Sequence, residues 1–210
     1  MKKIYLFMTM AMMAFATAFT ACEDEQVNPD NNDPQNNGDE NANYQMYSFN
    51  TKLSYDGTKL SNPSGFCAST RQAVPANNPS SDINAAWQNQ YGYMLCSPKS
   101  VKGQELYECY SANSLEYVGY NSTKIQNLGF VDIDDYYDVN TLEKMSVGTS
   151  YIDDKSSLGV GVNKLQNGQV IAFQTSDGCK GVMQVVTVAK IPKYITVKGY
   201  VAVPKNSSGK

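Results

Sequence analysis

The sequence contains no histidine. That absence excludes Ser-His-Asp and Cys-His catalysis, and also metal sites that need an imidazole ligand. The five cysteines form no C-x-x-C pair, which argues against a zinc site. Charge is scarce as well: from residue 43 onward, 15 Lys and Arg stand against 13 Asp and Glu. A domain this close to neutral gives no reason to expect nucleic acid as a partner.

The N-terminus has the pattern of an export signal. Lys2 and Lys3 precede an uncharged apolar run from Ile4 to Phe19, and the small residues Thr20 and Ala21 follow it. This run of 16 residues is short for a helix that crosses about 30 Å of hydrocarbon. We therefore predict that residues 1–21 are a signal peptide that is removed.

The cysteine directly after this signal changes its interpretation. The sequence "FTAC" at residues 19–22 resembles the lipobox of bacterial lipoproteins, although Phe19 stands where Leu is commonest. In that family the cysteine becomes the new N-terminus and carries acyl chains. The resemblance implies that Cys22 is the site of lipid attachment and that a membrane is a partner. More than one chain would hold the protein durably, because each buried CH₂ contributes about 0.8 kcal/mol.

Residues 22–42 are predicted to be a disordered tether. They contain seven acidic residues, no basic residue and no aromatic residue, so they cannot bury enough apolar area to offset the entropy of ordering. The acidic triplet at residues 23–25 resembles the signal that sends lipoproteins of the Bacteroidetes to the cell exterior. The resemblance implies a lipid-anchored protein of the outer membrane that faces outward.

Residues 43–205 are predicted to be a single β-rich domain, followed by a frayed C-terminus at 206–210. Residues 194–203 alternate, with Ile195, Val197 and Val201 on one face, which is typical of a strand with one buried side. Two β-rich runs flank Asp177-Gly178 and predict a hairpin over residues 167–190. Further strands are expected at residues 44–55 and 91–98.

Helix signals are few. Residues 80–88 allow one or two turns with Ser81 or Asp82 as cap, and residues 140–145 begin with a capping-box pattern of Asn140 and Glu143. Many short strands with frequent turns predict an all-β fold of two packed antiparallel sheets, resembling a β-sandwich, with one or two short helices.

The hairpin carries the most specific likeness to a known group of proteins. "NGQVIAFQTSDGCKGVMQV", at residues 167–185, is similar to a recurrent hairpin of surface or outer-membrane lipoproteins of the Bacteroidetes whose function is unassigned. Cys179 stands where that group usually has Lys. The resemblance implies an exported β-rich domain, and it implies neither catalytic residues nor a cofactor.

Aromatic residues are the candidates for ligand binding. The chain has 15 Tyr, and exposed Tyr or Trp side chains commonly stack on sugars or anchor protein partners. The alternative is that tyrosines only fill half-buried sheet surfaces. The candidate residues for a glycan or protein ligand are Trp87, Tyr107, Tyr110, Tyr117 and Tyr120.

An acidic loop at residues 132–143 is the nearest match to a metal site. Its potential ligands are Asp132, Asp134, Asp138, Asn140 and Glu143, spaced as in a calcium-binding EF-hand loop. Tyr137, however, occupies the position where that loop requires glycine. We therefore favour an acidic loop that leads into a capped helix, and we assign no metal.

The other four cysteines leave two alternatives open. In an exported protein Cys67, Cys96, Cys109 and Cys179 can form two disulfides, whereas buried thiols pack well as small apolar groups.

We predict a non-catalytic envelope lipoprotein whose domain binds a glycan or a protein. The alternative is a structural or assembly subunit of an envelope complex. A carboxylate-dependent hydrolase is less favoured, because Glu105 and Glu108 would point to opposite faces of a strand.

Overall fold

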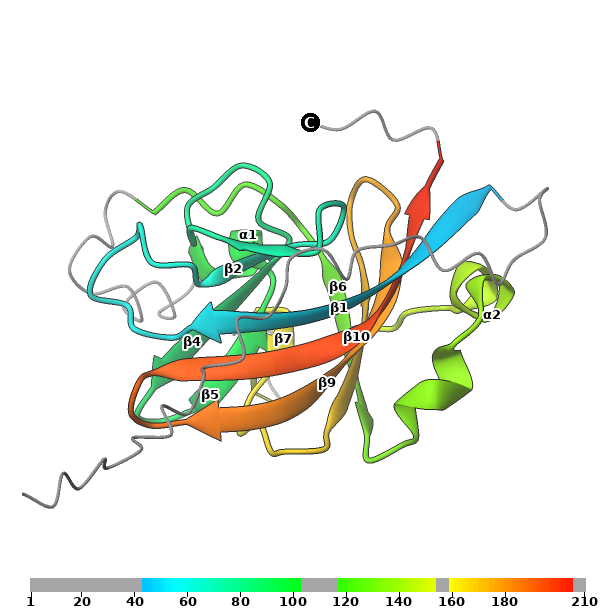
Figure 1. Cartoon of the computed structure of the whole chain (residues 1–210). Helices are drawn as coiled ribbons and strands as arrows, with labels where there is room; N and C mark the ends of the chain where they lie inside the picture. Colours follow the sequence, from blue (N-terminus) through cyan, green and yellow to red (C-terminus); the bar gives the residue numbers. More distant parts are fainter. Residues whose placement is uncertain (1–42, 103–116, 154–158, 206–210) are drawn as a thin grey trace, which may run out of the picture.

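The structure, a computed structural model, describes residues 43–102, 117–153 and 159–205. Within these residues, ten strands form two antiparallel five-stranded sheets that pack face to face (Figure 1). The predicted all-β fold of two packed sheets with short helices is confirmed. No helix in these three ranges is long and apolar enough to cross a membrane.

The first sheet contains the strands with the clearest alternation. Ile195, Val197 and Val201 are fully buried on its inner face, as their spacing predicted. The predicted hairpin is also present, and Gly178 closes its turn with φ +92, a backbone conformation that favours glycine. The strand order is β1 (Tyr44–Ser54), β10 (Tyr194–Pro204), β9 (Lys180–Ala189), β8 (Val170–Gln174) and β6 (Lys124–Gly129).

The second sheet is built from shorter strands. Their order is β3 (Gln72–Val74), β2 (Gly65–Cys67), β4 (Ile83–Gln88), β5 (Gly92–Cys96) and β7 (Gly161–Val162). The helix predicted at residues 80–88 is wrong, because this segment forms β4. Both faces of β4 are covered: Ile83 and Ala85 pack in the core between the sheets, and Ala86 packs on the opposite side. A strand buried on both faces lacks the polar alternation by which strands are recognised.

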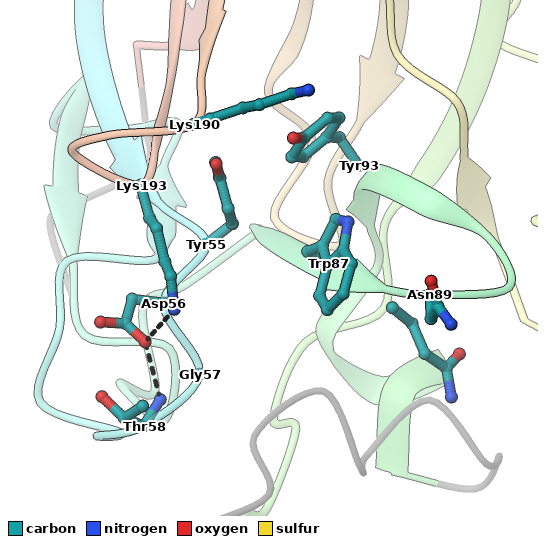
Figure 2. A pocket seen from close by; sticks show the side chains of 10 residues that line it. Tyr55, Asp56, Gly57, Thr58, Trp87, Asn89, Tyr93, Lys190 and Lys193 are labelled. Carbon is teal, nitrogen blue, oxygen red and sulfur yellow. Dashed lines mark hydrogen bonds and ion pairs between the residues drawn. The ribbon is translucent and has the colours of Figure 1, made fainter.

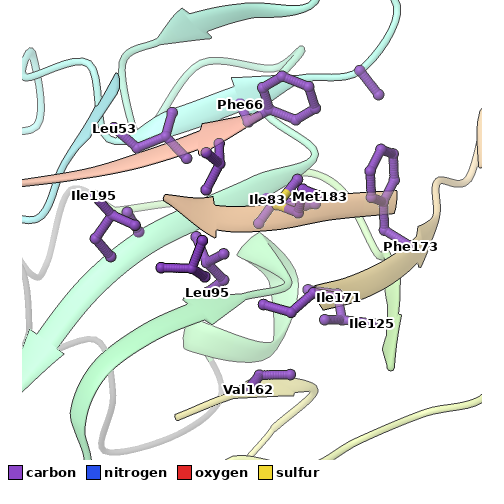
Figure 3. Packing of buried hydrophobic residues seen from close by; sticks show 14 of the residues in the cluster. Leu53, Phe66, Ile83, Leu95, Ile125, Val162, Ile171, Phe173, Met183 and Ile195 are labelled. Atoms are coloured by element: carbon purple, nitrogen blue, oxygen red, sulfur yellow. The ribbon is translucent and has the colours of Figure 1, made fainter. Parts of the chain in front are cut away.

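The main core lies between the two sheets (Figure 3). Leu53 and Ile195 from the first sheet meet Phe66 and Leu95 from the second, all fully buried. Two smaller clusters cover the outer faces of the sheets. The short helices are α1 (Pro98–Lys102), the 3₁₀-helix η3 (Ile133–Tyr136) and α2 (Val139–Lys144).

Helix α2 begins one residue before the predicted range. Its N-cap is Asp138, whose carboxylate accepts a hydrogen bond from the Thr141 backbone N–H at 2.7 Å. The predicted capping box of Asn140 and Glu143 is therefore wrong. Asp138 is an equally good cap, and its bond to Thr141 sets the start of the helix.

The described cysteines are thiols and not half-cystines. Cys67, Cys96 and Cys179 are each buried and form no disulfide, whereas Cys109 lies outside the described residues. Burial raises the pKa of the Cys179 thiol to about 12. Of the two alternatives, the structure supports buried thiols for these three residues.

Candidate functional site

A cleft of about 550 Å³ opens at one end of the sandwich. Three segments surround it: residues 55–58 after β1, the β9–β10 turn at residues 190–193, and the β4–β5 hairpin around residues 87–93 (Figure 2). Both sheets therefore contribute to its walls. Its volume falls within the range of about 300–1,000 Å³ that is typical of small-molecule sites. We refer to it as the aromatic cleft.

The aromatic side chains of the cleft continue the core-facing rows of the strands. Along β4 the inward positions are Ile83, Ala85 and then Trp87, because side chains alternate along a strand. Tyr93 lies directly opposite Trp87 on β5, so the two rings share one face of the sheet. At this end of the sandwich the row leaves the core, and Trp87 is 44% exposed.

Tyr55 continues the corresponding row of β1 and forms the floor of the cleft. Its ring meets that of Tyr93 edge to face, with centroids 5.0 Å apart, which links the two sheets. Its hydroxyl donates a hydrogen bond to the Ala189 carbonyl at 2.6 Å. Burial, together with the neighbouring Tyr93 hydroxyl, raises the pKa of Tyr55 to about 12. The floor is therefore neutral at physiological pH and is fixed in place by contacts on both sides.

One rim of the cleft is charged. Lys193 and Asp56 form an ion pair at 3.5 Å, and the Asp56 carboxylate also accepts a hydrogen bond from the Thr58 backbone N–H at 3.3 Å. Partial burial opposes ionisation of Asp56, but the bonds from Thr58 and the charge of Lys193 outweigh it, so its pKa lies below the usual value. Lys190 extends across the mouth of the cleft toward Tyr93 (Figure 2).

One polar group next to the cleft is buried without a hydrogen-bond partner in the described parts of the chain. The side-chain oxygen of Gln88 is buried and accepts no hydrogen bond within the described residues. A buried acceptor without a donor costs about 1–3 kcal/mol. Gln88 directly follows Trp87 on β4, so its side chain points to the opposite face of the sheet and this buried oxygen is closed to a ligand in the aromatic cleft.

The structure separates the five predicted ligand-binding aromatics. Only Trp87 lines the cleft, whereas Tyr107 and Tyr110 lie outside the described residues. Tyr120 is 47% exposed but lies beyond the Cys96 end of β5, away from the cleft.

The assignment of Tyr117 as a ligand-binding residue is wrong, because its side chain is only 1% exposed. Its hydroxyl donates to the Pro98 carbonyl and accepts from the Asn84 side-chain amide, both at 2.8 Å. The tyrosine is therefore part of the core on the outer face of the second sheet.

Acidic residues of the loop at residues 132–143 have partners within the protein. Asp132 caps η3, Asp138 caps α2, and Asp134 accepts a hydrogen bond from the Tyr200 hydroxyl at 2.8 Å. Glu143 contributes its backbone carbonyl to a 2.6 Å bond from the Lys180 ammonium. No cluster of three potential metal ligands occurs within the described parts of the chain.

Comparison with known proteins adds one structural neighbour. No family model and no curated protein matches the sequence. The chain is similar in structure to a DUF4466-family protein from Parabacteroides merdae, with a TM-score of 0.43 and 15% identity. The alignment covers 75% of this chain and 55% of that one, so the chain spans about half the length of its neighbour. That family is one of unknown function from a member of the Bacteroidetes, and likeness at this level assigns no activity.

Proposed function

We propose that this protein is a non-catalytic lipoprotein of the outer membrane, anchored through Cys22, that binds a glycan in the aromatic cleft on the cell exterior. The observation that carries the proposal is the aromatic wall of Trp87 and Tyr93 above the Tyr55 floor, in a cleft of about 550 Å³. Flat aromatic faces stack on the C–H faces of sugar rings, and the neighbouring polar groups bind hydroxyls.

The position of the cleft agrees with attachment at the N-terminus. The first strand begins at Tyr44, next to the proposed tether, and Tyr55 follows its other end. Eleven strand residues span about 35 Å. An anchor before Tyr44 therefore joins the domain at the end opposite the cleft, so the attachment itself does not block the access of a large glycan.

The charge of the cleft supports binding and not hydrolysis. Of the described residues that line it, only Asp56 carries a carboxyl group, and that group is paired with Lys193. Glycoside hydrolysis commonly uses two carboxyl groups, one of which remains protonated to act as an acid. Because its pKa is lowered, Asp56 is ionised at neutral pH and is unsuited to act as that acid.

Binding can be measured through the intrinsic fluorescence of the protein. Trp87 is the sole tryptophan, so a glycan that enters the cleft changes the entire tryptophan signal. The protein, with Cys22→Ser to remove the lipid, is screened on a glycan array, and hits are titrated by fluorescence and calorimetry. We expect Trp87→Ala to weaken binding about 30-fold by calorimetry, because losing a central aromatic contact costs about 2 kcal/mol.

Tyr120→Ala is the matched control, since it removes an aromatic ring of similar exposure outside the cleft. It should leave affinity unchanged. If no glycan bound on the array and crosslinking on intact cells captured a stable protein partner, glycan binding would be overturned in favour of the assembly role.

The anchor is tested separately on whole cells. Metabolic labelling with an alkyne fatty acid should label the wild-type protein and not Cys22→Ser, and added protease should digest it on intact cells. A bare thiol at Cys22, or protection until the cells are broken, would overturn the proposed location.

A further inference from the structure

The charged rim of the aromatic cleft also borders a second hollow. This hollow, of about 420 Å³, lies on the other side of the β9–β10 turn and includes Ser54 and Asn62. Asp56, Lys190 and Lys193 line both spaces. The three residues therefore form a ridge between two adjoining hollows, which is the arrangement that an extended ligand would cross.

The ridge carries one uncompensated positive charge. Asp56 and Lys193 neutralise each other in their ion pair. Asp56 is the sole acidic side chain among the described residues that line either hollow, so Lys190 has no anionic neighbour there. An exposed ammonium group held over a cleft attracts an anion, and its flexible stem lets it follow the position of that anion.

We infer that the glycan bound in the aromatic cleft is acidic, and that Lys190 binds its carboxylate or sulfate group at the ridge between the two hollows. This inference rests on the proposed glycan binding and adds the chemical class of the ligand. Trp87 and Tyr93 provide stacking for one sugar ring, and Lys190 supplies the charge that selects an acidic sugar.

The test compares sugars that differ only in charge. One pair is a galacturonic acid tetrasaccharide and its methyl ester, and the other is a chondroitin sulfate oligosaccharide and its desulfated form. Four proteins are titrated: the wild type, Lys190→Met, Lys190→Arg and Lys198→Met. Lys198 is the matched control, because it is an exposed lysine of β10 that lines neither hollow.

We expect the wild type to prefer one charged sugar over its neutral counterpart, and the preferred pair identifies the group as carboxylate or sulfate. Lys190→Met should lower affinity for that sugar up to about fivefold, the effect of losing one solvent-exposed ion pair. Lys190→Arg and Lys198→Met should keep the wild-type affinity for that sugar. Added salt should weaken binding by the wild type more than binding by Lys190→Met, because salt screens the charge of Lys190.

The failures of the two proposals are distinguishable. Equal binding of neutral and charged sugars, or equal effects of Lys190→Met and Lys198→Met, would overturn the acidic specificity and leave glycan binding in place. If the protein bound only neutral glycans and Trp87→Ala still weakened that binding, the acidic specificity would again be overturned and glycan binding would stand. An array on which no glycan binds would overturn both proposals.

Discussion

Replacing Tyr117 by phenylalanine separates a stability role from a binding role. Its hydroxyl donates to the Pro98 carbonyl and accepts from the Asn84 side-chain amide. The same amide donates at 3.0 Å to the Ala76 carbonyl, and Asn84 is fully buried. Phenylalanine keeps the ring and its packing, so Tyr117→Phe removes only the hydroxyl.

The expected loss follows from what the hydroxyl leaves behind. An ordinary hydrogen bond contributes about 1 kcal/mol net, but a buried partner left unsatisfied costs about 1–3 kcal/mol. Here one amide N–H of Asn84 loses its acceptor and the Pro98 carbonyl loses a donor. We therefore expect the free energy of unfolding to fall by about 2–3 kcal/mol. In a domain of this size that lowers Tm by about 4–12 °C.

Urea unfolding, followed by circular dichroism and by Trp87 fluorescence, measures this change. The midpoint should fall with an unchanged slope, because the surface exposed on unfolding stays the same. Tyr120→Phe is the control, and its free energy of unfolding should lie within about 0.5 kcal/mol of the wild type, as for most surface substitutions. Glycan affinity should be unaffected below the transition. If Tyr117→Phe left stability intact but weakened binding, our placement of Tyr117 in the core would be refuted.

Two further predictions concern packing and thiol chemistry. Gly199→Ala would place a Cβ 2.0 Å from the Val182 carbonyl oxygen in the centre of the first sheet, so we expect a loss of about 3 kcal/mol or more in urea unfolding. Gly129→Ala, which has φ +76 and no atom within 4 Å of the new Cβ, should cost only about 1–2 kcal/mol. Cys179 is fully buried and its pKa is about 12, so at pH 8 it is protonated in the folded state. Iodoacetamide should therefore alkylate Cys179 only when the protein is unfolded in urea, and peptide mass spectrometry detects the modification. Rapid alkylation of the folded protein would contradict the burial of this thiol.

Part of the first sheet could be predicted from residue patterns, even though β8 is buried on both faces. The alternation at residues 194–203 and the Asp177-Gly178 turn predicted β10 and the β8–β9 hairpin. The failure at β4 has a physical cause. Ala85 and Ala86 pack on opposite faces of the strand, so burial is continuous there and the period of two disappears.

The site was much less predictable. Trp87 was identified by residue type alone, but Tyr55 and Tyr93 lie 32 residues before it and six after it and meet only because the sheets stack. Alternation assigns a side chain to a face and does not say which strand of the other sheet lies opposite. The assignment of Tyr117 failed because residue type alone does not show that its hydroxyl finds both of its partners within the protein.

The construction of the cleft bears on how it would bind the proposed glycan. Tyr55 is only 7% exposed and is held by the Ala189 carbonyl and the ring of Tyr93, so the floor is already ordered before any ligand arrives. A preformed aromatic surface avoids the cost of immobilising side chains, about 0.5–1.5 kcal/mol for each one. Trp87 and Lys190, by contrast, are exposed at the mouth. The shape of the cleft is therefore set by Tyr55 and Tyr93, which also stabilise the domain. Its proposed selectivity depends on Trp87 and Lys190, which can be substituted without destabilising the domain.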